Sequence, residues 1–183
     1  RIIHLLILII SLVSSISYSQ LRIEITEGAE EPPRIAVIPF NWNFKSSDEG
    51  SLYNIISNDL VSFREFSIIS PEEMLSFPTT DDEVFYRDWK LLGIDYLLLG
   101  SVGKNVENSE LQISYSIFDI SREKRLHKAI ITGSLNSIRI LAHKISDRIY
   151  EKVKGIPGIF STKILYVAKP DNLKEKYYLH LTD

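Results

Sequence analysis

Glycines and a lysine at positions 100 to 104 come closest to a known chemical motif. The run Gly100-Ser101-Val102-Gly103-Lys104 has the residue types of a phosphate-binding loop. That motif needs four residues between its glycines, Ser or Thr after the lysine, and a helix next. Here two residues separate the glycines, and we expect a strand turn to follow. The run therefore predicts the end of a strand and not a nucleotide site.

A second pair of glycines has the spacing of the RNA-clamping loop of KH domains. In Gly155-Ile156-Pro157-Gly158 the surroundings are not basic, and we expect a strand, not a helix, to follow. Gly and Pro directly after an apolar helical stripe are typical of a helix end. We interpret this run as a helix stop.

The four histidines of the sequence give no metal-binding pattern. His4 lies in a predicted leader, and His127, His143 and His180 lie on different elements without a repeated ligand spacing. His143 stands one helical turn before Asp147, so the two side chains could pair. We expect His143 to have a surface or capping role, and we predict no metal.

The remaining polar candidates have structural explanations. Carboxylates at positions 81 to 83 suit the first turn of a helix, where they meet the positive end of its dipole. The sequence has no Gly-x-Ser-x-Gly elbow of a serine hydrolase. Trp42 and Phe44 are either anchors for a partner or residues that pack under a loop. We predict a protein that is not an enzyme and has no cofactor.

The amino-acid composition further limits the classes of protein to which the chain could belong. The chain has 183 residues, 44% of them apolar and 25% charged, which is usual for a globular protein. A net charge of −3 gives no basic footprint for nucleic acid or an anionic membrane. The sequence has no cysteine, which excludes disulfides, thiolate zinc sites and a lipid-modified cysteine.

Residues 1–19 have the pattern of a secretory signal peptide. Arg1 precedes an apolar run of about a dozen residues, shorter than the roughly 20 that span a bilayer. Small residues end this leader, so we predict cleavage between Ser19 and Gln20; an uncleaved anchor is the alternative. We expect the natural start upstream of Arg1, no membrane insertion after cleavage, and a periplasmic location.

The predicted mature start is a short strand on a tether. From Gln20 to Thr26, Leu21, Ile23 and Ile25 alternate with polar residues. Residues 27–33 are acidic, contain Gly28 and end in two prolines, as linkers do. The segment is either an edge strand of its own sheet or a strand that pairs with a partner.

Residues 34–162 predict one α/β (α+β) domain. A strand at 34–40, a helix from Ser51 and a strand at 66–69 form a crossover unit with parallel pairing expected. Residues 94–131 predict a three-stranded antiparallel meander, in which Gln112, Ser114 and Ser116 face water.

Two further helices complete the predicted domain. We expect one to run from about Thr79 to Leu92 with Phe85 and Trp89 buried together, and another to follow Ser137. Together these elements predict a mixed sheet of about five strands with two main helices laid on it, similar to anticodon-binding domains.

The tail predicts two strands, at 164–168 and 177–181, joined by a polar loop. An isolated hairpin is marginally stable in water, so we interpret residues 163–183 as the beginning of a longer structure.

The order of these features resembles the N-terminal domain of the TolB family of the Tol–Pal envelope system. The resemblance extends over nearly the whole mature chain. The matching residues are Leu21-Arg22-Ile23-Glu24-Ile25-Thr26, Gly28, Arg34 to Trp42, Ile56 to Leu60, Trp89, Leu92-Gly93-Ile94-Asp95, Gly100 and, most specifically, positions within His143 to Val167.

The resemblance implies a non-enzymatic adaptor that supports outer-membrane integrity and constriction at cell division. It implies that the tail opens the first blade of a six-bladed β-propeller that binds the lipoprotein Pal. It also implies that the mature N-terminus docks on the C-terminal domain of TolA. The implied docking residues are Gln20, Leu21, Arg22, Ile23, Glu24, Ile25, Thr26, Glu27 and Gly28.

Two other interpretations remain open at this point. Outer-membrane accessory proteins that regulate cell-wall synthesis or secretion have a related small α/β domain, although they are generally lipoproteins and this chain has no cysteine. A nucleic-acid-binding module is disfavoured by the acidic charge. For the adaptor, we hypothesise that the leading strand exchanges between its own domain and the partner's sheet edge.

Overall fold

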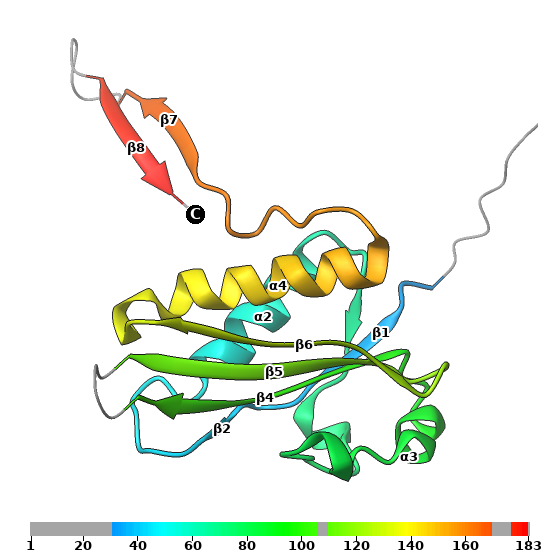
Figure 1. Ribbon diagram of the computed structural model, residues 1–183. Coiled ribbons are helices and arrows are strands. Elements are labelled where there is room, and N and C mark those ends of the chain that lie inside the picture. Colours follow the sequence, from blue (N-terminus) through cyan, green and yellow to red (C-terminus); the bar gives the residue numbers. More distant parts are fainter. Residues whose placement is uncertain (1–30, 106–109, 170–176, 183) are drawn as a thin grey trace, which may run out of the picture. The chain divides into compact units, whose positions relative to one another are not determined.

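The computed structural model describes residues 31–105, 110–169 and 177–182 (Figure 1). The chain divides into two compact units, residues 1–31 and 32–183. All of the described helices and strands belong to the second unit.

The main sheet has six strands in the order β3-β1-β4-β5-β6, with β2 paired to β4. Two strand pairs are antiparallel, β4–β5 and β5–β6, and they form the predicted meander. The parallel pairs are β1–β3, β1–β4 and β2–β4. The strands are β1 (Arg34–Val37), β2 (Asn41–Trp42), β3 (Ser67–Ile68), β4 (Tyr96–Lys104), β5 (Leu111–Asp119) and β6 (Lys124–Gly133).

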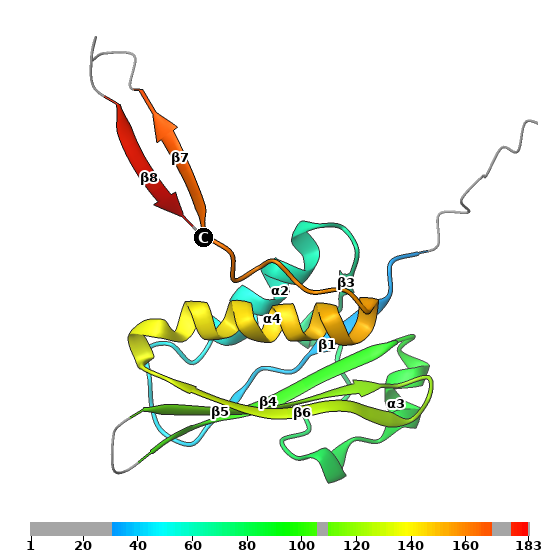
Figure 2. The ribbon, with the colours of Figure 1, turned by 45° about the horizontal axis from the view of Figure 1, so that its top comes forward.

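Two long helices cover one face of this sheet, as Figures 1 and 2 show. They are α2 (Ser51–Ser62) and α4 (Ile138–Lys154), and their apolar stripes bury Leu52, Ile56 and Leu60 on α2 and Ile145 and Ile149 on α4. These side chains join Ile113 and Ile117 of β5 in the larger of two cores. The predicted fold class, with two main helices on a mixed sheet, is confirmed.

The opposite face is covered by shorter elements, which corrects the helix predicted at 79–92. Residues Asp81–Glu83 form a 3₁₀ turn, η2, and the helix α3 spans only Tyr86–Leu91. Another 3₁₀ turn, η1 (Pro71–Glu73), precedes them, and η3 (Leu135–Ser137) precedes α4. Val84 and Phe85 have extended backbone angles (ψ 99° and 94°), and these break the helix.

This break also separates Phe85 from Trp89, which we predicted to be buried together. Trp89 is 1% exposed in the second core, whereas Phe85 is 65% exposed. A continuous helix would place residues four apart on one face, but Phe85 precedes the helix and turns away from the sheet.

Two details of the strand prediction are also wrong. Ser116 is 1% exposed, and its side chain hydrogen-bonds Asp81 of the element that covers this face. Asn41–Trp42, which lies beyond the end of the strand predicted at 34–40, pairs with β4 as β2. Trp42 and Phe44 lie 5.4 Å apart in an edge-to-face contact and pack against the larger core, which favours packing over a role as partner anchors.

Strands β7 (Ile164–Ala168) and β8 (Tyr178–Thr182) form a separate antiparallel sheet. The ring of Tyr166 stacks on that of His180 at 5.1 Å. Both strands of the hairpin are confirmed, and their membership of a propeller stays a prediction.

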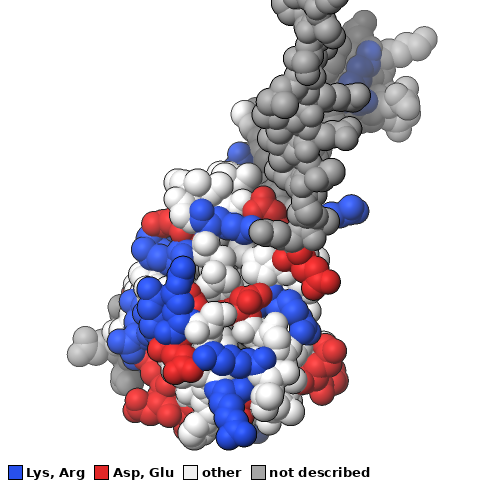
Figure 3. All heavy atoms as spheres, turned by 90° about the vertical axis from the view of Figure 1, so that its right-hand side faces the viewer, with Lys and Arg blue, Asp and Glu red and all other residues white. Residues whose placement is uncertain are grey.

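Charges of both signs cover the surface seen in Figure 3. Lys and Arg gather on its left, which is the side that faces the viewer in Figure 1. The net charge of −3 therefore conceals a local basic region.

Candidate functional site

The predicted docking segment, Gln20 to Gly28, and the cleavage point between Ser19 and Gln20 lie outside the described residues. Both stay predictions. The structure describes the point at which the tether joins the domain, beginning at Glu31.

Arg34 fixes the end of the tether to the sheet. Its backbone N–H donates to Asp95 Oδ2 at 2.8 Å, and its guanidinium Nη1 donates to the carbonyl oxygen of Leu92 at 2.7 Å. The N–H of Ser67 donates to the carbonyl oxygen of Pro33 at 3.1 Å. Glu31 and Pro32 are exposed, so the tether leaves the domain beside β3.

The turn that receives Arg34 depends on Gly93. This residue has φ of +66°, and a Cβ built on it would lie 3.2 Å from the Nη1 atom of Arg34. Glycine permits that backbone conformation and leaves room for the guanidinium. The run Leu92-Gly93-Ile94-Asp95 therefore forms a binding turn for the base of the tether.

An apolar groove of about 180 Å³ lies where α2 and α4 end. It is lined mainly by rings and aliphatic side chains: Phe63 directly after α2, Tyr150 on α4, and residues of the segment after α4, including Phe160. Phe160 contacts Phe63 at 5.4 Å and Tyr150 at 6.0 Å between ring centroids. Glu65, two residues before Ser67, also lines the groove.

One polar contact defines the rim of the groove. Tyr150 donates its hydroxyl to Glu65 Oε2 at 2.9 Å. The hydrogen bond to this carboxylate, with a smaller contribution from burial, raises the pKa of Tyr150 above its usual value. Lys154 Nζ lies 3.4 Å from Glu65 Oε2, so the groove is apolar within and charged at its margin.

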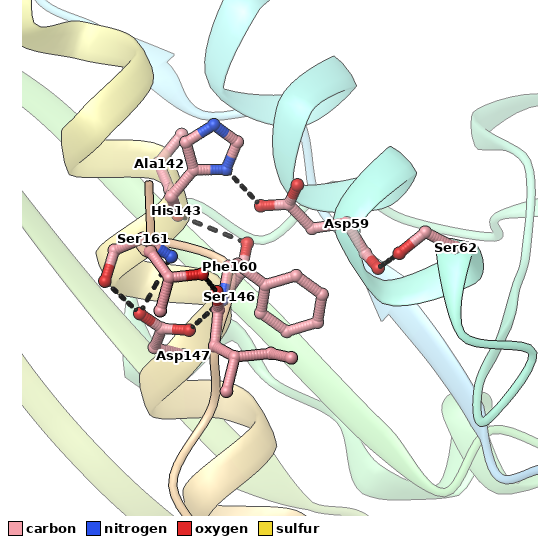
Figure 4. Close-up of polar contacts among 10 residues, drawn as sticks. Asp59, Ser62, Ala142, His143, Ser146, Asp147, Phe160 and Ser161 are labelled. Carbon is pink, nitrogen blue, oxygen red and sulfur yellow. Dashed lines mark hydrogen bonds and ion pairs between the residues drawn. The ribbon is translucent and has the colours of Figure 1, made fainter. Parts of the chain in front are cut away.

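His143 is buried, which corrects its predicted surface role (Figure 4). Its Nδ1 lies 2.8 Å from Asp59 Oδ2 on α2, and an ionised carboxylate can only accept, so Nδ1 is the donor. The predicted pairing with Asp147 does not form. His143 instead joins α4 to α2, and Ser146 donates to the carbonyl oxygen of Ala142 at 3.2 Å.

Asp147 holds the segment that follows α4 (Figure 4). Its carboxylate accepts from the backbone N–H of Phe160 at 2.6 Å and of Ser161 at 3.2 Å. The returning chain passes so close that a Cβ on Gly158 would lie 2.4 Å from the Asp147 Cα. Gly155, with φ of +77°, ends the helix, which confirms the helix-stop interpretation.

Asp81 lies at the centre of a charged cluster on the opposite face. Its Oδ2 accepts from Lys128 Nζ at 2.9 Å and from Arg125 Nη1. Burial pushes the pKa of Asp81 upward, but hydrogen bonds from Lys128, Ser116 and Arg125 together outweigh burial and leave the pKa below its usual value. The carboxylate therefore stays ionised and ties η2 to β6.

The motifs that suggested chemistry do not assemble a reactive site. Gly100 to Lys104 lies within β4, so it is not a phosphate loop. Among the described residues, no group of three His, Asp or Glu side chains could hold a metal ion. No helix in residues 31–105, 110–169 or 177–182 is long and apolar enough to cross a bilayer.

Fold and site together define a small mixed α/β domain whose sheet holds the base of an N-terminal tether. The TolB amino-terminal domain model matches residues 21–126. The chain belongs to that family, which confirms the resemblance seen in the sequence.

Relatives and a solved structure agree. The Tol-Pal system protein TolB of Alcanivorax borkumensis is 38% identical over 165 residues, 90% of this chain and 37% of that protein. The protein of the same name in Pseudomonas syringae pv. syringae is 36% identical over 153 residues, 84% and 35% of the two chains. The crystal structure of TolB from Acinetobacter baumannii matches with a TM-score of 0.70 and 28% identity, covering 84% of this chain and 36% of that one. This chain spans little more than a third of these proteins.

Three features of this region were not predicted from the sequence. They are the Arg34–Asp95 contact, the apolar groove, and the role of Asp147. The first had a readable signal, because Gly93 followed by Asp95 indicates a tight turn with a free acceptor. The groove had none, since Phe63 and Phe160 are 97 positions apart in the sequence.

Proposed function

We propose that this chain is a periplasmic, non-enzymatic adaptor of the Tol–Pal system that supports outer-membrane integrity and constriction at division. The observation that carries the proposal is the family match over residues 21–126, which begins inside the predicted docking segment. The names of the relatives place those proteins in the Tol–Pal system.

The docking partner in this proposal is the C-terminal domain of TolA. Residues Gln20 to Gly28 would add to its sheet edge as a strand, with Leu21, Ile23 and Ile25 on the buried side. Main-chain pairing supplies affinity in this mode, and alternate side chains supply specificity. The Arg34 contacts support it. Hydrogen bonds of 2.8 Å to Asp95 and 2.7 Å to Leu92 fix the residue from which the segment extends.

The second partner, Pal, would bind a propeller of which residues 163–183 form the first strands. The hairpin supports this assignment by its exposed apolar side chains: Leu165, Val167, Leu179 and Leu181 are each at least 60% exposed. A propeller blade buries such side chains against the neighbouring blade. This chain's share of its relatives, 35% to 37%, leaves room for such a domain in them.

The proposal includes an exchange of the leading strand, which would lie against its own domain when it is not on the partner. Occupancy of its own domain and occupancy of the partner would then exclude each other.

A pull-down of the TolA C-terminal domain tests the docking proposal. The mature chain should retain the domain, and a variant lacking residues 20–31 should lose it. Ile23→Asp should also lose binding, because it places a charge on the apolar side, whereas Glu24→Gln on the polar side should retain it. Undiminished binding by the deletion would overturn the proposal.

A further inference from the structure

Strand β6 ends the sheet on the side opposite β3. It runs for ten residues, Lys124–Gly133, and β5 is its only partner among the described strands. The outer row of N–H and C=O groups on such an edge is available for pairing with another extended chain.

Alternate residues of β6 point towards the helix layer. His127, Ala129 and Ile131 lie opposite Ile117, Tyr115 and Ile113 of β5 in the register of the pair. Their β5 partners belong to the larger core. A strand added outside β6 would therefore direct every second side chain to the same side, beneath α4.

A hollow of about 300 Å³ opens at that place. It lies between the sheet and α4, and its lining includes Tyr115, Ile131, Lys144, Arg148 and Glu151. Four of its eight lining residues, Lys144, Asp147, Arg148 and Glu151, are charged, which distinguishes it from the apolar groove around Phe160. A strand paired to β6 has space here for side chains that carry polar ends.

Basic side chains of α4 border this hollow. Lys144 and Arg148 line it, Lys152 follows Arg148 by one helical turn, and all three are exposed. On β6, Lys124, Arg125 and Lys128 are also exposed, but Arg125 and Lys128 turn to the opposite face, where they bind Asp81.

The two carboxylates that line this hollow already have partners. Asp147 accepts from residues 160 and 161, and Glu151 lies 2.7 Å from Arg148. The positive field persists all the same: burial and then the charges of Lys152 and Arg148 lower the pKa of His127.

We propose that the β6 edge and this hollow bind an extended acidic segment of a partner protein by strand addition. The segment pairs its main chain with β6 and directs alternate carboxylates towards Lys144, Arg148 and Lys152. A second copy of this chain is a poor occupant, because its own β6 edge, Lys124–Gly133, has no carboxylate that could meet Lys144, Arg148 and Lys152. An alternative is that the basic residues of β6 only protect this edge from pairing. That role would not require a hollow beside the strand.

Fluorescence anisotropy with labelled peptides tests this proposal on the folded mature chain. A heptapeptide of alternating Glu and Val should bind, and its affinity should fall with added salt. Three matched peptides should bind weakly: one with Gln for Glu, one with the same residues in blocks, and one N-methylated at alternate positions. Equal binding of the blocked or N-methylated peptide would overturn strand addition.

Protein variants locate the site. Lys144→Glu should weaken the alternating peptide about fivefold, since an attractive contact becomes repulsive. Lys45→Glu makes the same charge change in the loop after β2 and should leave affinity unchanged, with circular dichroism confirming that both variants fold. Equal effects of the two variants would overturn the location.

Two measurements exclude other occupants. Sedimentation velocity should show a monomer, and a dimer that Lys144→Glu dissociates would assign the edge to a second copy and overturn the proposal. Glu24→Gln together with Glu27→Gln in the mature chain should leave peptide affinity unchanged. Tighter binding by that variant would assign the edge to the chain's own leading segment and overturn the partner assignment.

Discussion

The two faces of the sheet are covered in different ways. On one face, α2 and α4 supply continuous apolar stripes to a large core. On the other, a 3₁₀ turn and the six-residue helix α3 cover the end of the sheet around Leu97 and Phe118. The remainder of that face has the polar hollow around Ser101 and Ser114. The long helices exclude water from the centre of their face and leave a hollow at the β6 edge. The short elements exclude water only where a large side chain such as Trp89 fills the space.

The largest expected effect tests whether the thinly covered face is a true core. Trp89→Ala should lower the free energy of unfolding by about 4 kcal/mol, because the side chain is fully buried. Phe85→Ala, in the same segment, is the control and should cost little, since Phe85 is 65% exposed. Urea unfolding measures both. Similar losses for the two variants would contradict the broken helix.

On the helix-covered face, Ile145→Ala should cost about 3 kcal/mol, because Ile145 is fully buried and leaves a cavity. Ile140→Ala on the same helix is the matched control, with Ile140 40% exposed. In the double variant of Ile145→Ala and Trp89→Ala, the two losses of unfolding free energy should add, because the sheet separates the two cores. Strong non-additivity in urea unfolding would show that the faces are coupled.

A smaller effect is expected where β4 and the chain after β1 approach closely. Gly100→Ala would place a Cβ 2.4 Å from the Phe40 ring and 2.8 Å from the Ser114 carbonyl oxygen, which should cost about 2 kcal/mol through overpacking. Gly50→Ala meets its nearest atom at 3.5 Å and serves as the control. Thermal unfolding should show a lower midpoint for the first variant alone.

The smallest expected effect concerns the ion pairs of Asp81 on the thinly covered face, which should make the free energy of unfolding depend on pH. The pKa of Asp81 is below its usual 3.8, so its ion pairs stabilise the fold at neutral pH. This stability is present above pH 3.8 and is lost as the pH falls through the lower folded pKa. Asp81→Asn should cost about 1 kcal/mol at neutral pH and reduce the acid dependence.

Asp82→Asn is the control for that measurement, because Asp82 is exposed beside Asp81. Unfolding measured from pH 7 to pH 2 should give nearly the wild-type curve for it. An unchanged curve for Asp81→Asn would mean that the cluster contributes nothing to stability.

The sequence predicted the regular part of this molecule and failed where contacts are non-local. Apolar stripes on α2 and α4 and alternation in β5 are local patterns, so those elements were predicted nearly to their ends. The burial of His143 depends on Asp59, 84 positions away, and no window of sequence shows it. The break before α3 was missed because cap residues at Thr79 and Glu83 also suit a short 3₁₀ turn, in which Glu83 accepts from Thr79 at 2.7 Å.

The same limit applies to the candidate site. The alternation of residues 20–26 predicts a strand, and the family match covers residues 21–26. The groove, the Arg34 contacts and the β6 hollow combine residues from separate elements, so only a fold can reveal them. Edge position itself was not predictable, because it depends on which strands pair.

The base of the tether is held by positions that are far apart in the sequence. The bond from Arg34 to Asp95 spans 61 positions, whereas β4, β5 and β6 pair with their neighbours in sequence. Closing a long loop costs more entropy than pairing adjacent strands. We therefore expect the meander to pair before β1 takes its place beside β4. Until β1 is in place, the leading segment has no fixed base on the domain.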